Sequence, residues 1–272
     1  MGQVSVIGPR ICDDRPTHGS KDSMIVHGIM EHLILYTSPY PKTRIGRPHD
    51  GGYVIATLPG TYDAFLSGGI ANDISFEEHF LQLYPDTPCY AFDGTISHLP
   101  HDHPKITFVK KNLGDSNSDE TTNLHDYMEP YHDLFMKIDI EGHEFRVMPT
   151  LTQLMKKIKQ LVIEIHSPGD IRMFPDYFKG LHDIDNQKMF DLLQRINQTH
   201  TLVHFHANNG CAMQEIDGIR LPHVFELTYV RNEFVLEKRK NTESLPTPLD
   251  RRNIPQKEDY VLSGFPYSTA GA

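Results

Sequence analysis

The sequence predicts an α/β fold in which seven strands alternate with helices, and three observations indicate this class. From Tyr62 onward, short apolar runs alternate with segments of helical periodicity, a pattern typical of βαβ units and a parallel sheet. Of the 272 residues, 38% are hydrophobic and 23% are charged, a balance that favours a folded core over disorder. The length fits one large domain with additions, or two small domains. A sheet of this kind binds its ligands beyond the carboxyl ends of the strands.

Seven apolar runs have the length and composition of strands. They comprise residues 63–70, 88–94, 105–112, 134–141, 159–166, 201–208 and 224–231. Three segments between them have helical periodicity, namely residues 73–85, 144–157 and 186–198. A further helical stretch starts at Met24, where apolar residues recur at helical spacing as far as Leu35.

Composition divides the chain into three parts. Residues 1–23 are polar with scattered glycine and proline, and we expect them to form a flexible N-terminal arm. Residues 24–232 hold all the predicted helices and strands and form the folded domain. Residues 233–272 are hydrophilic, which predicts an extended C-terminal tail over the domain surface.

Charge and cysteine content narrow the class of protein. Lys and Arg number 26 against 36 Asp and Glu, a net charge of −10, which disfavours binding to a nucleic-acid backbone. The three cysteines, Cys12, Cys89 and Cys211, are widely separated, and they predict free thiols rather than a disulfide framework. No apolar run approaches the roughly 20 residues of a membrane span, and the N-terminus lacks the apolar core of a signal peptide. We therefore expect a soluble, cytoplasmic protein that does not contact a membrane.

Polar and glycine residues follow the first two predicted strands. Gly68 and Gly69, followed by Asn72, end the first strand, and glycines there let the backbone approach a ligand closely. The alternative is a plain turn in which Asn72 caps the next helix. The loop is not GxGxxG, which disfavours a nicotinamide oxidoreductase. Asp93 ends the second strand, 24 positions after Gly69, where a carboxylate can accept hydrogen bonds from ribose hydroxyls; the alternative is a turn residue before Gly94.

Ionisable residues follow the next strands. The fourth predicted strand leads into Asp139, Glu141 and His143, and a polar cavity is the less costly surrounding for so many charges. The fifth strand ends at His166 and the sixth contains His206. A carboxylate with two imidazoles can hold a divalent cation or place a general base near a hydroxyl. The alternative is that these are ordinary surface histidines, since the chain has 17.

The run LFMKIDIEGHEFRVMPTL at residues 134–151 resembles the central motif of FkbM-like S-adenosylmethionine-dependent methyltransferases, K-I-D-x-E-G-x-E. Upstream, RIGRPHDGGY and GIANDISFE resemble the patterns R-x-G-x-x-x-D-G-G-Y and G-I-x-N-D-x-S-F-E of one subgroup. Downstream, IEIH, HFHANNG and IDGIRLPHVFELTYVR are similar to that subgroup as well. The resemblance covers about residues 40–260. The glycine loop, SGGIAND, departs from the D-x-G-x-x-x-G that is commoner in the wider family.

This resemblance implies a Rossmann-like, seven-stranded class I methyltransferase sheet with helices on both faces and its last strand antiparallel. It also implies that S-adenosylmethionine lies over the ends of the first two strands, with a helical and lid-like segment before them that includes Asp50. Residues 24–232 would then be the methyltransferase domain. The implied cofactor-binding residues are Tyr53, Gly68, Gly69, Asn72, Asp93, Gly94, Thr95, Asn112 and Asp139.

The predicted activity is methylation of a hydroxyl on a sugar, a glycan or another small molecule, so the expected partner is a carbohydrate or small-molecule acceptor. The candidate catalytic residues are His166, His143 and Glu141, because a hydroxyl needs a base to remove its proton. A divalent metal held by Asp139, His166 and His206 is the alternative way to activate it. Metal-free catalysis is favoured, since Mg²⁺ prefers oxygen ligands to imidazole. A different hypothesis is a catalytically silent methyltransferase-like scaffold that binds partners through its tail.

Overall fold

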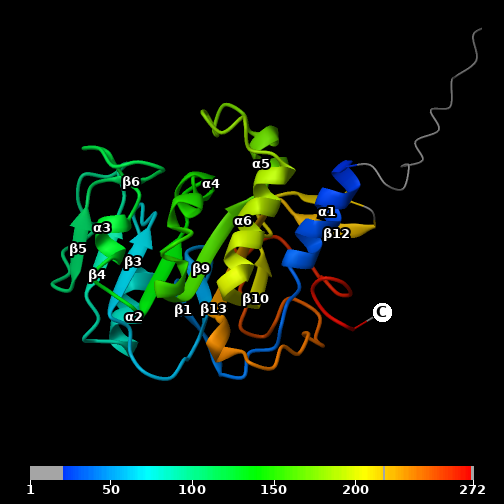
Figure 1. Cartoon of the computed structure of the whole chain (residues 1–272), viewed down its shortest axis with the longest axis horizontal. Coiled ribbons are helices and arrows are strands. Elements are labelled where there is room, and N and C mark those ends of the chain that lie inside the picture. The colour runs from blue at the N-terminus through cyan, green and yellow to red at the C-terminus, as the bar shows by residue number, and fades with distance from the viewer. Residues whose placement is uncertain (1–20, 217, 271–272) are drawn as a thin grey trace, which may run out of the picture.

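The protein is described here by a computed structural model, which covers residues 21–216 and 218–270. Its centre is a seven-stranded sheet (Figure 1). The strands are β3 (Ala64–Gly68), β4 (Cys89–Phe92), β5 (Ile106–Val109), β8 (Leu134–Ile138), β9 (Ile158–His166), β10 (His200–Ala207) and β13 (Val224–Arg231). Each falls on one of the seven predicted runs, with ends that differ by at most three residues, so the predicted strands are confirmed.

The strand order is β10-β13-β9-β8-β3-β4-β5. Strands β9, β8, β3, β4 and β5 pair in parallel, whereas β13 runs antiparallel to both β9 and β10. The prediction that the last strand is antiparallel is therefore confirmed. The chain begins the sheet in its middle at β3 and proceeds first toward β5 and later toward β10. This reversal of direction beside β3 marks the place where such sheets bind ligands.

Three small strand pairs lie outside the main sheet. They are β1 (Lys42–Gly46) with β2 (Gly52–Ala56), β6 (Asn112–Leu113) with β7 (Thr121–Thr122), and β11 (Met213–Ile216) with β12 (Ile219–Pro222). The sequence analysis predicted none of these pairs as separate strands. They are short, and β1 contributes a single buried apolar side chain, Ile45, to the core, which is too little to produce a strand pattern.

Six α-helices and three short 3₁₀ turns complete the described part of the chain. The helices are α1 (Lys21–His32), α2 (Ser75–Leu83), α3 (His125–Met128), α4 (Glu144–Val147), α5 (Pro168–Met173) and α6 (Asn186–Thr199). The 3₁₀ turns are Met148–Leu151, Met155–Lys157 and Asn232–Phe234. The helix predicted over residues 144–157 is thus broken into α4 and two 3₁₀ turns. Pro149 is the physical reason, because it has no N–H to donate and clashes with the preceding turn.

Helices cover both faces of the sheet because alternate side chains of each strand point to opposite sides. Phe65 and Phe135 pack against Phe80 of α2, with ring centroids 4.6 and 4.4 Å apart. Leu66 and Met136, one position further along, join the core formed with α1 and α6 on the other face. Figure 1 shows α1 beside α6 on this face. The predicted fold class is confirmed in this respect too.

The described residues begin with α1 and end with the segment after Phe234. Residues 1–20 of the predicted N-terminal arm, and Cys12 with them, are outside the described residues, whereas Lys21 already begins α1. The described part of the C-terminal segment after Phe234 has neither helix nor strand, but it makes the isolated bridges Tyr36–Lys240 and Leu245–Leu262. Within residues 21–216 and 218–270, no helix combines the length and hydrophobicity that a bilayer crossing requires.

Candidate functional site

A pocket of about 820 Å³ opens at the carboxyl ends of β3, β4 and β8. Its walls come from the loops after these strands, from the β1–β2 turn and from the segment after α5. The predicted site residues that line it are Gly69, Asn72, Asp93, Thr95, Asn112, Asp139, Glu141 and His143. These eight predicted residues therefore surround one pocket, whereas His166 and His206 do not line it.

The loop after β3 is fixed against the end of β8. Gly69 has φ +78°, and a Cβ at this position would lie 1.6 Å from the Asp139 carbonyl oxygen. Only glycine permits this close approach. Lys137 Nζ donates to the Gly69 carbonyl at 2.7 Å. By contrast, Gly68 does not line the pocket, because its α-carbon faces the Leu113 side chain.

Asp93 joins the loops after β3 and β4. Its Oδ2 accepts a hydrogen bond from Ala71 N and its Oδ1 accepts one from Thr95 N, both at 2.8 Å. Asp93 is only 7% exposed, yet it lines the pocket. Beside it, Gly94 N donates to Asn112 Oδ1 at 3.1 Å, so Gly94 supports the wall that Asn112 forms.

Asp139 lies at the end of β8, in the centre of the pocket wall. Tyr53 OH, from β2, donates to Asp139 Oδ2 at 2.6 Å, and Lys137 Nζ lies 3.8 Å from the same oxygen. Burial raises the pKa of Tyr53 well above its usual value, so the phenol stays protonated and remains a donor. Tyr53 itself does not line the pocket; it acts on the pocket through Asp139.

His166, at the end of β9, lies among three carboxylates. Its Nδ1 is 2.9 Å from Asp170 Oδ2, and its Nε2 is 3.2 Å from Glu141 Oε2 and 3.6 Å from Glu164 Oε2. Burial alone would lower the pKa of His166, but hydrogen bonds to Asp170 and Glu164 outweigh it and hold the pKa well above the usual value. His166 is therefore a buried imidazolium at neutral pH, one side chain behind the pocket wall.

Glu141 is the residue of this His166 cluster that lines the pocket. Its φ of +55° places a non-glycine residue in the left-handed region, a strained conformation that is common where a side chain must be aimed at a functional site. The side chain is 52% exposed and lines the pocket beside Tyr177, which bonds to it. Burial raises the pKa of Glu141, and the charge of His166 opposes this shift.

Two further carboxylates lie behind this wall. Burial raises the pKa of Glu164 to about 8 and that of Glu144 to about 7, and the charge of Asp139 adds to both shifts. Glu144 Oε1 accepts a hydrogen bond from His166 N at 3.1 Å. Near pH 7 these two carboxyl groups are therefore protonated to a large extent, and they do not add two full negative charges to the wall on the β8–β9 side of the pocket.

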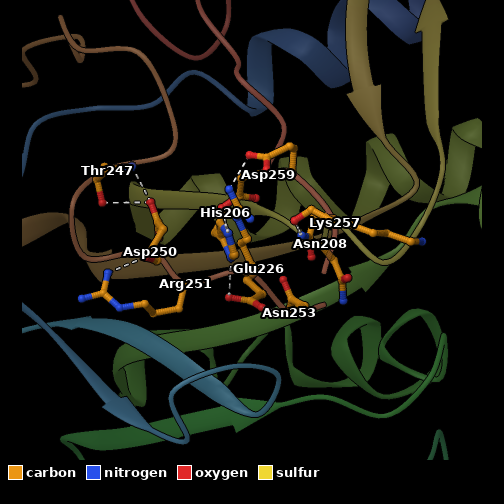
Figure 2. Close-up of polar contacts among 12 residues, drawn as sticks. His206, Asn208, Glu226, Thr247, Asp250, Arg251, Asn253, Lys257 and Asp259 are labelled. Carbon is orange, nitrogen blue, oxygen red and sulfur yellow. Dashed lines mark hydrogen bonds and ion pairs between the residues drawn. The ribbon is translucent and has the colours of Figure 1, made fainter. Parts of the chain in front are cut away.

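The structure does not support the alternative in which Asp139, His166 and His206 hold a metal ion. In the part of the chain that the structure describes, no three His, Cys, Asp or Glu side chains are grouped so that they could hold a metal ion. His206 does not join Asp139 and His166, because β13 lies between β9 and β10. It instead pairs with Glu226 Oε2 at 3.2 Å and Asp259 Oδ2 at 3.5 Å (Figure 2). Burial opposes protonation, but these carboxylates raise the pKa of His206 to about 10, and an imidazolium cannot ligate a metal.

Sequence reasoning missed Asp170 and Tyr177. The sequence contains a pattern that could have indicated Asp170, the spacing Ser-x-x-Asp typical of a helix N-terminus. Ser167 caps α5 by accepting a hydrogen bond from Asp170 N at 3.4 Å, and Asp170 therefore lies one turn after His166. Tyr177 had no such pattern, because it follows α5 in an irregular segment. Its side chain is 66% exposed at the pocket rim.

Comparison with known proteins gives the family. A family model described as the methyltransferase FkbM domain matches residues 44–209, more than half of the chain. The chain belongs to the FkbM methyltransferase family. The resemblance found in the sequence is thereby confirmed, and all the residues that line the pocket lie within the matched region of this FkbM-family chain.

Solved structures are also similar to this FkbM-family chain in part. The precorrin-6y C5,15-methyltransferase from Geobacter metallireducens GS-15 is 8% identical, with a TM-score of 0.30; the match covers 64% of this chain and 82% of that one. The pyocyanin biosynthetic protein PhzM is 10% identical, also with a TM-score of 0.30, and the match covers 64% of this chain and 52% of that one. The sequence matches no curated protein.

Proposed function

We propose that this protein transfers the methyl group of S-adenosylmethionine to a hydroxyl oxygen of a sugar, a glycan or another small molecule. Membership of the FkbM family supports methyl transfer. The observation that carries the choice of a hydroxyl acceptor is the chain of contacts from Glu141 through His166 to Asp170. It presents a carboxylate to the pocket, and a hydroxyl needs such a base whereas the methyl donor does not.

The half of the pocket over β3 and β4 fits the donor. Gly69 lets the loop after β3 lie directly against the Asp139 carbonyl, and both residues line the pocket. In this proposal the amino-acid part of the donor lies beside them. Asp93 keeps acceptor capacity for ribose hydroxyls, since its Oδ2 has two lone pairs and accepts one backbone hydrogen bond, from Ala71 N. When bound, the donor supplies a methyl group on a positively charged sulfur, which the carboxylate of Asp139 at the pocket wall favours.

The half of the pocket over β8 and β9 suits the acceptor. Glu141 takes the proton from the acceptor hydroxyl as the oxygen attacks the methyl carbon, and the carbon–sulfur bond breaks to leave a methyl ether and adenosylhomocysteine. His166 is already protonated, so in this proposal it holds the Glu141 carboxylate in place and is not itself the base. His143, which is exposed and lines the pocket, is the second candidate for the base that takes the proton from the acceptor hydroxyl.

Two measurements test the proposal. Calorimetry with adenosylhomocysteine and with NAD should show binding of the first alone, as the glycine loop predicts. Release of adenosylhomocysteine should then be followed with a panel of sugars, glycosides and simple alcohols, with matched amines as the control. Absence of donor binding by the folded protein would refute the proposal. Binding without transfer to any hydroxyl would instead support the silent scaffold, and transfer to amines alone would refute the hydroxyl acceptor.

A further inference from the structure

One wall of the pocket is not part of the seven-stranded sheet. Arg47, Asp50 and Gly51, which line it, belong to the turn between β1 and β2. Within the hairpin, Arg44 donates to the His49 carbonyl at 2.6 Å. Across the pocket lining, Arg47 Nε lies 3.4 Å from Asp73 Oδ2. These contacts lie within the hairpin and toward the loop after β3. His49 and Asp50 of the turn contact another segment of the chain.

The C-terminal segment makes these contacts with His49 and Asp50. Asn253 Nδ2 lies 3.2 Å from Asp50 Oδ1 and donates to Glu226 Oε1 at 2.8 Å. One residue earlier, His49 Nδ1 lies 3.1 Å from the Arg252 carbonyl. Each of the two contacts with the turn joins residues 203 positions apart. Asn253 is only 4% exposed, and Figure 2 shows it beside Glu226.

Buried partners hold this segment on both sides of Asn253. Before it, Asp250 Oδ1 pairs with His204 Nε2 at 2.7 Å. After it, Asp259 pairs with His206 at 3.5 Å. Both histidines belong to β10, the edge strand of the sheet. The segment from Asp250 to Asp259 (Figure 2) is therefore a fixed part of the domain rather than a loose extension.

Between these anchors, Asn209 holds the backbone. Its Oδ1 accepts from Ile254 N at 2.8 Å, and its Nδ2 donates to the Ile254 and Lys257 carbonyls at 3.0 Å. Asn253 is next to this clamp, so its side chain has little freedom to move away from Asp50. The family match ends at Asn209, which means that the segment lies outside the matched region and yet contacts the pocket turn.

We propose that the segment Asp250–Asp259 completes the cofactor site and that Asn253 is a positioning residue for Asp50. The amide of Asn253 shares its two N–H donors between the Asp50 and Glu226 carboxylates, which otherwise repel each other. Asp50 is thereby kept at the pocket wall, where its negative charge faces the cationic amino-acid part of the donor. This inference rests on the proposed function, because it requires the donor to occupy the pocket.

A double-mutant cycle tests the proposal in the full-length protein. Asn253→Ala and Asp50→Asn are made singly and together, and adenosylhomocysteine affinity is measured by calorimetry. Each single variant should bind about 5- to 10-fold more weakly. The double variant should bind no more weakly than Asp50→Asn. Asn253 acts only by positioning the Asp50 carboxylate, and this carboxylate is absent from the Asp50→Asn background. The matched control is Asn241→Ala, since Asn241 also donates from the tail, to the Glu243 and Tyr267 carbonyls, and its affinity should be unchanged.

The cycle separates positioning from general support of the fold. If Asn253→Ala weakens binding equally in the native background and in the Asp50→Asn background, the residue is merely structural and the proposal is overturned. Unchanged affinity in either single variant overturns it as well. If Asn253→Ala does not fold, Asn253→Ser, which keeps a small donor, replaces it in the same cycle. Failure of the native protein to bind adenosylhomocysteine refutes the proposed function itself and is seen before any variant is made.

Discussion

The Glu141 carboxylate lies 3.2 Å from Nε2 of His166, whose Nδ1 is 2.9 Å from Asp170. Glu141 is at the pocket surface, whereas His166 and Asp170 are buried. The pKa shifts follow this order: burial raises the pKa of Glu141 above its usual value, and the carboxylates around His166 raise the pKa of the imidazole well above its usual value. The arrangement therefore places a carboxylate at the pocket surface and a fixed positive charge behind it.

Glu141→Gln should remove the base and leave the donor site intact. We expect kcat to fall by about 10²- to 10⁴-fold, the usual range for loss of a general base. Affinity for adenosylhomocysteine should stay within about twofold, because in the proposed function Glu141 contacts the acceptor and not the donor. Steady-state kinetics and calorimetry measure the two quantities.

The matched control for this variant is Glu129→Gln. Glu129 is exposed and lies 3.6 Å from Lys157, outside the pocket, so neither quantity should change. An equal loss of kcat and of donor affinity in Glu141→Gln would show that Glu141 supports the cofactor site instead of the chemistry.

His206→Gln should alter how stability depends on pH. His206 has a pKa of about 10 in the folded protein and of about 6.5 when unfolded. The stabilising effect of its charge is therefore fully present below about pH 6.5 and is lost as pH rises toward 10. Asp250 also lies near enough to favour that charge, along with Glu226 and Asp259.

Urea denaturation at about pH 6, 8 and 10 should show the largest loss of unfolding free energy for His206→Gln at the lowest pH. The difference from the native protein should shrink as pH rises. His103→Gln, in the loop before β5 and partly exposed, is the control and should lose little at any pH. A loss in His206→Gln that is the same at all three pH values would mean that His206 contributes by packing and not by charge.

Asp93→Asn tests the donor half of the pocket. The amide keeps one oxygen as an acceptor but loses the negative charge and half of the acceptor capacity. Ribose hydroxyls should then bind less well, and we expect adenosylhomocysteine affinity to fall at least about tenfold, which is about 1.4 kcal/mol. Asp86→Asn, in the exposed turn before β4, should bind normally. Normal binding by Asp93→Asn would exclude Asp93 from contact with the ribose.

The sheet and half of the site were predictable because local pattern determines them. Buried strands such as β9 are largely apolar runs, and the carboxyl ends of parallel strands meet at one edge, so Asp93 and Asp139 were expected to share a pocket. Pro149, in contrast, breaks a helix whose apolar periodicity continues through it. Periodicity reports which side chains are buried, and it does not report the hydrogen bonds that the backbone loses.

The errors at the site arise from strand order. His166 and His206 belong to consecutive long strands in the sequence, but β13 enters the sheet between them, so their side chains belong to different clusters. Asn253 lies in a segment without helix or strand, and its contact with Asp50 spans 203 positions. Neither relationship has a local signal, because both depend on how the last strand and the tail return to the sheet.

Gly69→Ala separates steric contact from backbone strain. Gly69 and Gly180 both have positive φ, at +78° and +84°, so alanine is strained at either position. A Cβ on Gly69 would lie 1.6 Å from the Asp139 carbonyl oxygen, whereas a Cβ on Gly180 would meet no atom within 4 Å. Gly180→Ala should therefore lose about 1 kcal/mol of unfolding free energy and bind adenosylhomocysteine normally.

Gly69→Ala should lose more stability than Gly180→Ala and should also lose donor binding. The loop has to move away from Asp139 to make room for the alanine side chain. Thermal unfolding and calorimetry on the two variants side by side measure this difference. Equal losses of stability with donor binding retained in both would mean that the Gly69 loop can shift without consequence. In that case the close approach of β3 and β8 would not be what shapes the cofactor site.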